Sequence, residues 1–287
     1  MIALVTDSNS QLPPELAERY GVEVVPLNVT VDGESFLEGV DLDADGFYAR
    51  FAGGYRPEVA TSQPSPGRFA SVFEELAGRG VEEILAVHVG SAVSGTVNSA
   101  RLAAESAAVP VRIVDTGTVS FGVACCVWEA GEALAAGGSV EEAASVAEKV
   151  GTRVRTIFTV GALDLARAGG RLSSGDDGAR EGVPLLTMAG AGMQVVGRVE
   201  DLEAAVDAMA SYVVAAGPGL RAAVGIADDG AAPLAHALEE RLAGADEVRE
   251  VLRYRIGPSV GAHTGPGTAG AFFYRSSFHR SSFHGSG

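Results

Sequence analysis

Residues 84–96 read Ile-Leu-Ala-Val-His-Val-Gly-Ser-Ala-Val-Ser-Gly-Thr, an apolar run that gives way to a loop of small and hydroxyl residues. The run 84–89 is short and almost entirely apolar, which predicts a strand buried on both faces. A helical pattern follows over 96–106, and Ser and Gly are common residues just before a helix. A strand, a loop and a helix in this order predict a parallel sheet covered by helices.

The same order recurs on either side of this stretch. We expect a strand at 2–5 with a helix from Pro13-Pro14 to Gly21, a strand at 22–29 leading into a turn at Asp32-Gly33, and a strand at 111–114 with a helix over 120–135. These elements predict an α/β fold whose N-terminal domain, residues 1–155, is a mostly parallel sheet with flanking helices. Ligands of such folds gather where strands end, so polar residues in those loops are the first functional candidates.

The second half of the chain has a different alternation. Helices are expected at 140–150, 163–168, 202–215 and 232–242, and strands at 155–160, 184–188, 193–199 and 222–227, with two terminal strands around a Gly-rich turn. This mixture predicts a second, α+β domain over residues 156–274. The pentapeptide Arg-Ser-Ser-Phe-His occurs at 275–279 and again at 280–284, and we expect residues 275–287 to form a disordered tail.

Charge and composition exclude several classes of function. The 287 residues include 37 acidic and 21 basic ones, for a formal net charge of −16 and a sequence pI near 4.7. Such a surface repels phosphate backbones and anionic lipid headgroups, so we expect no nucleic-acid partner and no stable membrane insertion. Lys149 is the single lysine of the chain, which argues against lysine-based covalent chemistry.

Cysteine and histidine usage argues against disulfide and metal sites. Cys125 and Cys126 are adjacent within an apolar run, which predicts buried core residues. Outside the tail the histidines are His88, His236 and His263, far apart in sequence, so no metal site is expected. No phosphate-binding loop, zinc motif or nucleophile elbow occurs, and no cofactor is expected. The first residues lack the features of a secretory signal, which predicts a cytoplasmic protein.

Three hydroxyl-rich segments follow predicted strands. They contain Asp7 and Ser8, Thr61 and Ser62, and Ser94 and Gly95. Asp and Ser side chains in such places ordinarily cap helices, by accepting hydrogen bonds from the free N–H groups of the first turn. Capping leaves Thr61 and Ser62 without a role, because Ser65 and Pro66 already form a regular helix start. Hydroxyl groups near a helix start can also hold a small anion or a carboxylate.

Two further positions allow two interpretations each. Arg171 follows the pair Gly169-Gly170. In one interpretation the glycines cap a helix and the Arg is solvated, and in the other the Arg is directed at an acidic ligand. His263 lies in the Gly-rich segment 261–267, where a structural His competes with one placed beside a ligand.

Seven short segments occur in a fixed order. They are Val5-Thr6-Asp7-Ser8, Val25-Pro26-Leu27, Thr61-Ser62-Gln63-Pro64-Ser65, Ser94-Gly95-Thr96 with Ser99-Ala100, Val114-Asp115, Gly169-Gly170-Arg171-Leu172-Ser173, and Ile256-Gly257-Pro258 with 261–267. Each is a weak signal alone. Taken together, they resemble the DegV family over about residues 2–274, and seven segments in the right order make a specific match.

The resemblance implies a two-domain protein that binds one long-chain fatty acid, such as palmitate, in a tunnel between the domains. Thr61, Ser62 and Ser94 correspond to the hydroxyls that bind the carboxylate, and the residues around this head group would be His263, Arg171, Gly95, Asp7 and Ser8. The protein would then be a lipid carrier in phospholipid synthesis and not itself an enzyme. Its partner would be the catalytic subunit of a fatty acid kinase, which converts the presented carboxyl group to an acyl phosphate.

Two departures from the family pattern and one alternative function stand beside this resemblance. The stretch Ser174–Gly182 is more acidic and Gly-rich than the family pattern, and Thr116 stands where a Ser is common. The alternative is an acyl-ester hydrolase, with Ser94 or Ser62 as nucleophile, His263 as base and Asp7 as the orienting acid. The residue types are present, and their mutual geometry decides between the two functions.

Overall fold

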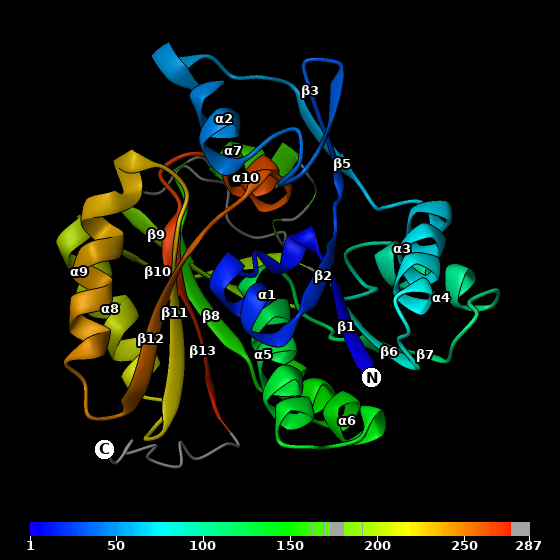
Figure 1. Ribbon diagram of the computed structural model, residues 1–287. Coiled ribbons are helices and arrows are strands. Elements are labelled where there is room, and N and C mark those ends of the chain that lie inside the picture. Colours follow the sequence, from blue (N-terminus) through cyan, green and yellow to red (C-terminus); the bar gives the residue numbers. More distant parts are fainter. Residues whose placement is uncertain (162, 169, 171, 173–180, 191, 277–287) are drawn as a thin grey trace, which may run out of the picture.

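The computed structural model of the protein describes residues 1–161, 163–168, 170, 172, 181–190 and 192–276. These residues form three sheets with helices between and around them (Figure 1). Arg171, residues 174–180 of the acidic stretch and residues 277–287 of the tail lie outside the described residues, together with the predictions made for them.

The first sheet is parallel throughout, which confirms the fold predicted for the first half. Its order is β2-β1-β6-β7, with β1 at Ile2–Asp7, β2 at Val22–Val25, β6 at Glu83–His88 and β7 at Val111–Asp115. One face is covered by α3 (Pro66–Gly78) and α4 (Thr96–Ala104), and the other by α5 (Phe121–Ala135) and α6 (Val140–Gly151). The 3-10 turn η1 (Ser8–Ser10) and α1 (Pro14–Tyr20) join β1 to β2.

The single strand predicted at 22–29 is wrong, because the structure divides this segment between two sheets. β2 ends at Val25, and Pro26 has no N–H group to continue the ladder. The small sheet that follows has the order β4-β3-β5, with β3 at Asn28–Val31, β4 at Glu34–Leu37 and β5 at Val59–Ser62. The turn at Asp32-Gly33 is confirmed, and φ is positive at both residues (49° and 84°), as a tight hairpin requires. Between β4 and β5 lie α2 (Ala44–Ala49) and η2 (Ala52–Gly54).

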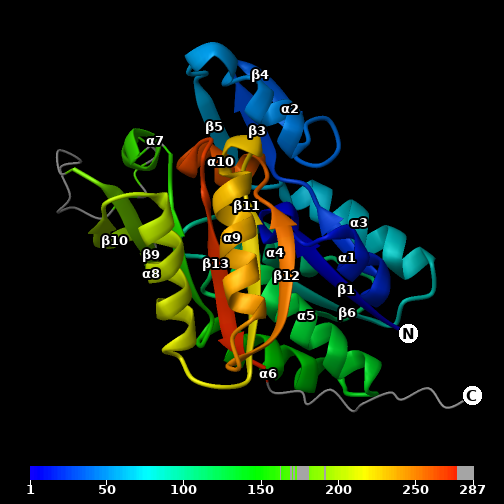
Figure 2. The same ribbon diagram turned by 90° about the vertical axis from the view of Figure 1, so that its left-hand side faces the viewer.

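The third sheet is mostly antiparallel and belongs to the second half of the chain. Its order is β10-β9-β8-β13-β11-β12, with β8 at Arg155–Thr159, β9 at Val183–Ala189, β10 at Gly192–Val199, β11 at Leu220–Ile226, β12 at Val248–Arg255 and β13 at Ala269–Arg275. Figure 2 shows α8 (Leu202–Val214) and α9 (Ala232–Ala243) side by side on one face of this sheet. The shorter elements are α7 (Leu163–Ala168) and η3 (Asp229–Ala231). The α+β character of this half agrees with the sequence, and the domain boundary at residue 155 remains a prediction.

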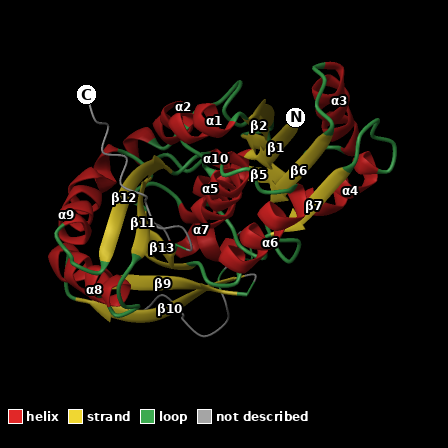
Figure 3. Ribbon diagram, turned by 60° about the horizontal axis from the view of Figure 1, so that its bottom comes forward, coloured by secondary structure: helices red, strands yellow, loops and turns green. Residues whose placement is uncertain are grey.

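α5 lies between the first and third sheets (Figure 3). Twelve of its 15 residues are buried, whereas a helix on a protein surface buries one stripe only. Its side chains share one core with Leu85 of β6 and with Tyr254 and Phe272 of the third sheet. Cys125 and Cys126 lie in this core, as predicted, and both are free thiols.

The Gly-rich segment near the C-terminus contains a helix that was not predicted. The two predicted terminal strands are present as β12 and β13, but α10 (Pro258–Thr264) takes the place of the turn between them, and each strand pairs with β11. Pro258 occupies the first turn of α10, where its missing N–H group costs nothing. Gly265, with φ of 75°, ends the helix. His263 is therefore held on a regular element and not in a bent loop.

Candidate ligand-binding site

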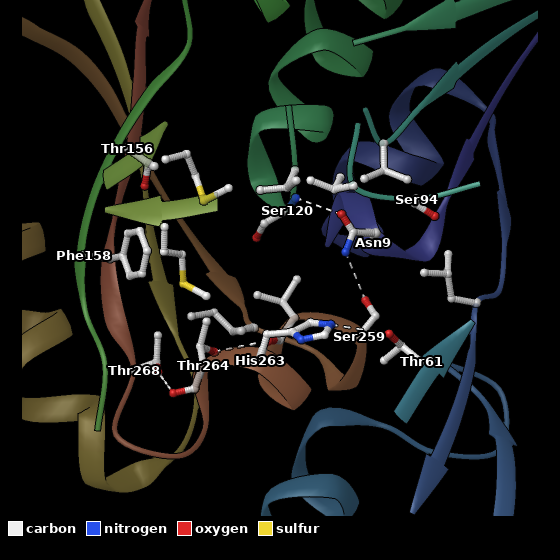
Figure 4. A pocket seen from close by; sticks show the side chains of 18 of the residues that line it. Asn9, Thr61, Ser94, Ser120, Thr156, Phe158, Ser259, His263, Thr264 and Thr268 are labelled. Atoms are coloured by element: carbon white, nitrogen blue, oxygen red, sulfur yellow. Dashed lines mark hydrogen bonds between the residues drawn. The ribbon is translucent and has the colours of Figure 1, made fainter. Parts of the chain in front are cut away.

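A pocket with a cavity volume of about 250 Å³ lies between the first and third sheets, beside the small sheet. The lining comes from both halves of the chain and includes η1, β5, the loops before α4 and α5, strands β8–β10 and β12–β13, and α10. Figure 4 shows Thr61 and Ser94 on one side of this pocket, and Thr156 and Phe158 on the opposite side.

One end of the pocket is polar. Thr61 and Ser62 come from the end of β5, Ser94 and Gly95 from the loop before α4, and His263 from α10, and we call these five residues the polar end. Thr61 Oγ1 lies 3.4 Å from His263 Nε2. Ser94 Oγ lies 2.8 Å from Thr96 Oγ1 and accepts the Thr96 N–H at 3.3 Å, so it also serves the helix start. Ser62 and Gly95 are exposed, which places the polar end at the surface.

The rest of the pocket is largely apolar. Its apolar lining consists of Leu27, Val89, Val93, Val119, Phe158, Met188, Met193, Tyr254, Ile256, Val260 and Phe272. Two hydroxyls in this part already donate to backbone carbonyls at 2.9 Å, Thr156 to Ala271 and Thr268 to Thr264. Their hydrogen-bonding capacity is directed to the protein, so this part of the cavity suits an apolar group.

Among the described residues that line the pocket, none is Asp, Glu, Lys or Arg. A ligand anion held here therefore depends on hydroxyl, amide, imidazole and backbone N–H donors. The described residues also contain no group of three or more His, Cys, Asp or Glu side chains placed to hold a metal ion. Nor does any helix in the described part of the chain have both the length and the apolar character needed to span a membrane.

A second group of polar lining residues was not predicted. Asn9 Oδ1 accepts the Ser120 N–H at 2.9 Å, and Asn9 Nδ2 donates to Ser259 Oγ at 3.3 Å (Figure 4). Ser120 is held at φ of 53° and ψ of −142°, a backbone conformation that non-glycine residues rarely adopt. Asn9 therefore ties the start of α5 to α10 across the pocket wall. In sequence it is two residues from Asp7, and only its place in that loop could have suggested it.

Asp7 and Ser8 lie behind the wall and do not line the pocket. The buried Asp7 carboxylate accepts the Val89 N–H and lies near His88 Nδ1, both at 3.0 Å, and it accepts the Asn9 N–H at 3.1 Å. Ser8 donates to Glu38 at 2.5 Å and accepts the Leu27 N–H at 2.9 Å. The capping interpretation thus accounts for Asp7, and both residues support loops that shape the pocket.

The structure brings together five of the eight predicted site residues and does not assemble the hydrolase triad. Ser94 and His263 both line the pocket, but the carboxylate of Asp7 is taken up by His88 and two backbone N–H groups. A triad needs the acid on the base that serves the nucleophile. The position of Arg171 lies outside the described residues.

Comparisons with known proteins agree with this architecture. The model of the family described as "Uncharacterised protein, DegV family" matches residues 1–276. A DegV domain-containing protein of Streptomyces coelicolor is 33% identical over 276 residues, which cover 94% of this chain and 96% of that protein.

Solved structures give the same result. A DegV family protein from Thermus thermophilus, described as binding fatty acid, superposes with a TM-score of 0.84 at 33% identity and covers 96% of this chain and 99% of its own. DegV from Bacillus subtilis, described as a fatty acid binding protein, superposes with a TM-score of 0.83 at 26% identity and the same coverage. The fold, the pocket between the first and third sheets and the match along almost the whole chain lead to one conclusion: this protein belongs to the DegV family.

Proposed function

We propose that this protein binds one long-chain fatty acid, such as palmitate, and leaves it chemically unchanged. The observation that carries the proposal is the pocket, which has hydroxyl groups at one end and apolar side chains along the rest. A fatty acid has the same two-part character. The similar Thermus and Bacillus proteins are described as fatty acid binding, which supports the assignment.

The acyl chain supplies most of the affinity in this proposal. Burial of a CH₂ group contributes about 0.8 kcal/mol, so the roughly fourteen methylenes of palmitate contribute on the order of 11 kcal/mol before the costs of association. Phe158, Met188 and Met193 give the chain an apolar surround. Methionine side chains adapt readily to the shape of a flexible ligand.

The carboxylate is assigned to the polar end. A carboxylate accepts hydrogen bonds at two oxygens, and Thr61, Ser62 and Ser94 each offer one hydroxyl. His263 lies within reach of the same position, next to Thr61. Hydrogen bonds to an ionised acceptor are stronger than neutral ones, so these donors fix the head group although the chain dominates the affinity.

Exposure of the polar end supports a role in presenting the carboxyl group. Ser62, Gln63 and Gly95 are exposed, while Thr156, Gly270 and Phe272 in the apolar part are buried. A fatty acid in this orientation places its reactive group at the surface. We therefore assign the chemistry to a partner, a fatty acid kinase catalytic subunit that forms the acyl phosphate for phospholipid synthesis in the cytoplasm, and assign no cofactor to this chain.

The first test is mass spectrometry of the purified protein under native conditions and again after solvent extraction. We expect one fatty acid per chain, and a protein that arrives empty and takes up no added palmitate would contradict the proposal. In a second step, the double variant Thr61→Ala/Ser94→Ala is expected to retain palmitate at least about tenfold more weakly, because two hydrogen bonds to a charged group are lost. Ser71→Ala removes an exposed hydroxyl on α3 and serves as the matched control.

A further inference from the structure

The buried carboxylate of Glu38 lies next to α10 and outside the pocket lining. Glu38 directly follows β4 and is 5% exposed. Its Oε2 atom accepts a hydrogen bond from the Ser8 hydroxyl at 2.5 Å, and its Oε1 atom accepts the Ser259 N–H at 2.8 Å. The Gln11 side-chain amide donates to Oε1 as well, at 3.4 Å. All three partners are donors, so the position calls for a group that only accepts.

These donors come from segments that are far apart in the chain. Ser8 and Gln11 belong to the segment around η1, whereas Ser259 is in the first turn of α10. Gln11 reinforces the link, since its side-chain oxygen accepts the Gly257 N–H. Glu38 and Gln11 together therefore hold the N-terminal end of α10, where backbone N–H groups lack partners within the helix.

α10 carries a large part of the pocket wall. Ser259, Val260, His263 and Thr264 all line the pocket, and they come from this helix of seven residues. A shift of the first turn moves His263 relative to Thr61 on β5, to which it lies close. The position of α10 thus sets the geometry of the polar end.

Burying a carboxylate between two segments has a cost in free energy. Burial raises the pKa of the Glu38 carboxyl, and the hydrogen bonds from Ser8 and Ser259 oppose this shift. A buried ionised group commonly contributes less to stability than well-packed apolar residues of similar volume. Geometry, more than stability, explains a carboxylate at this position.

We propose that Glu38 is a positioning residue for the ligand site, because it holds α10, and through it His263, against the segment around η1. The inference rests on the proposed function for its consequence on ligand, but the hold on α10 is a property of the protein alone. The effect on α10 and the effect on the ligand can therefore be measured separately.

The test uses Glu38→Gln, which keeps the shape of the side chain. The side-chain oxygen of Gln can replace only one of the two carboxylate oxygens. If it accepts the Ser259 N–H, the NH₂ group faces the Ser8 hydroxyl, whose proton loses the acceptor that Glu38 Oε2 provided. Gly257→Ala disturbs the same contact from the other side, because a methyl group there would lie 2.7 Å from Gln11 Oε1 and 2.8 Å from Glu38 Oε1. Glu38→Asp keeps both acceptor oxygens and is the rescue variant. Glu142→Gln, which changes a carboxylate on α6 that accepts hydrogen bonds from Ser139, is the control.

The first measurement is hydrogen exchange of ligand-free protein, followed by mass spectrometry of peptides that cover α10 and of peptides that cover α8. In Glu38→Gln and Gly257→Ala we expect exchange in α10 to be at least about tenfold faster and exchange in α8 to be unchanged, as for loss of one charge-assisted hydrogen bond. Glu38→Asp should lie between them and the wild type, and Glu142→Gln should leave α10 unchanged. Unchanged exchange in α10 of both test variants would overturn the inference.

The second measurement is the rate at which palmitate leaves each protein for phosphatidylcholine vesicles. We expect release from Glu38→Gln to be about tenfold faster, with Glu142→Gln like the wild type. Faster exchange in α10 combined with unchanged release would overturn the role in the ligand site. If the wild type takes up no palmitate, the proposed function fails, and hydrogen exchange alone decides whether Glu38 holds α10.

Discussion

Arg221 of β11 is the centre of a buried ionic cluster that joins the two halves of the protein, and its replacement is the sharpest test of their packing. The guanidinium group makes ion pairs with Glu129 at 2.7 Å and Glu132 at 2.8 Å, both on α5, and with Glu250 of β12 at 3.1 Å. It also lies over the ring of Trp128, 4.3 Å from the centroid. The Arg221 side chain is 7% exposed and that of Glu129 is 0% exposed.

The expected cost of Arg221→Met follows from what the substitution leaves behind. Glu129 would keep hydrogen bonds from Tyr274 and Ser276 but lose its opposite charge in a buried position. Removing one partner of a buried ion pair costs about 3–5 kcal/mol, most of it from the remaining uncompensated charge. For a protein of this size the melting temperature should fall by on the order of 10 °C.

The assay is urea unfolding followed by circular dichroism and by the fluorescence of Trp128, the single tryptophan. Arg79→Met is the matched control, because Arg79 pairs with Glu23 at 3.2 Å and Glu75 at 3.1 Å while it is 49% exposed. An exposed pair contributes about 0–1 kcal/mol. Equal losses in the two variants would refute the claim that burial makes the Arg221 cluster special.

A double variant tests the mechanism behind the number. If the uncompensated charge of Glu129 causes the loss, Arg221→Met/Glu129→Gln must be more stable than Arg221→Met alone, since the second substitution removes that charge. The two effects are then strongly non-additive, as expected for residues in direct contact. Additive losses would show that packing, and not charge, dominates this contact.

Three further outcomes are expected. Burial raises the pKa of the Cys125 and Cys126 thiols, so little thiolate is present at pH 8. Iodoacetamide should therefore label neither residue until the protein is unfolded, and rapid labelling of folded protein would contradict their place in the core. Gly261→Ala should destabilise the protein by about 1–3 kcal/mol in thermal unfolding, because a methyl group there would lie 2.6 Å from the Tyr48 hydroxyl, and no loss would mean that α10 can move away from α2 freely. Ser139→Ala breaks the capping box at the start of α6 and should cost about 1 kcal/mol in the same assay, whereas an unchanged melting temperature would show that α6 is fixed by packing alone.

The parallel half of the fold follows from its sequence because each strand there is a short apolar run bounded by turn residues. β1, β6 and β7 are covered by α3 to α6, which come from the same half of the chain, so local patterns contain most of the information. The segment 22–29 fails for a physical reason: it is rich in residues that suit a strand, but Pro26 lacks the N–H group that a continuous strand needs, and it lies between β2 and β3. α10 fails because a helix of seven residues that contains Gly261 and is flanked by Gly257 and Gly265 has too weak a local signal, and packing against α2 and β5 stabilises it.

Some residues of the candidate site could also be predicted from the sequence, and others could not. Thr61, Ser94 and His263 could be named from the sequence because they lie in short segments whose order resembles the family, although each segment alone is a weak signal. Asn9, Ser120 and Ser259 could not, because Ser and Asn are common near helix starts and their mutual contacts join positions more than 100 residues apart. Such contacts exist only once the first and third sheets have packed on α5.

Asp7 and Glu38 stand behind the pocket wall, and this arrangement is compatible with the carboxylate ligand proposed for so acidic a chain. Asp7 accepts the N–H of Val89 and Glu38 accepts the N–H of Ser259, and in both cases the donor residue itself lines the pocket. Two unit charges about 4 Å apart repel by roughly 4 kcal/mol at an effective dielectric constant near 20, so either acid on the wall itself would oppose an anionic head group. Bound to backbone N–H groups behind the wall, the same acids fix the segments that carry the hydroxyl and imidazole donors. The negative charge therefore serves to order the site, and hydroxyl and imidazole groups are left to contact the proposed ligand.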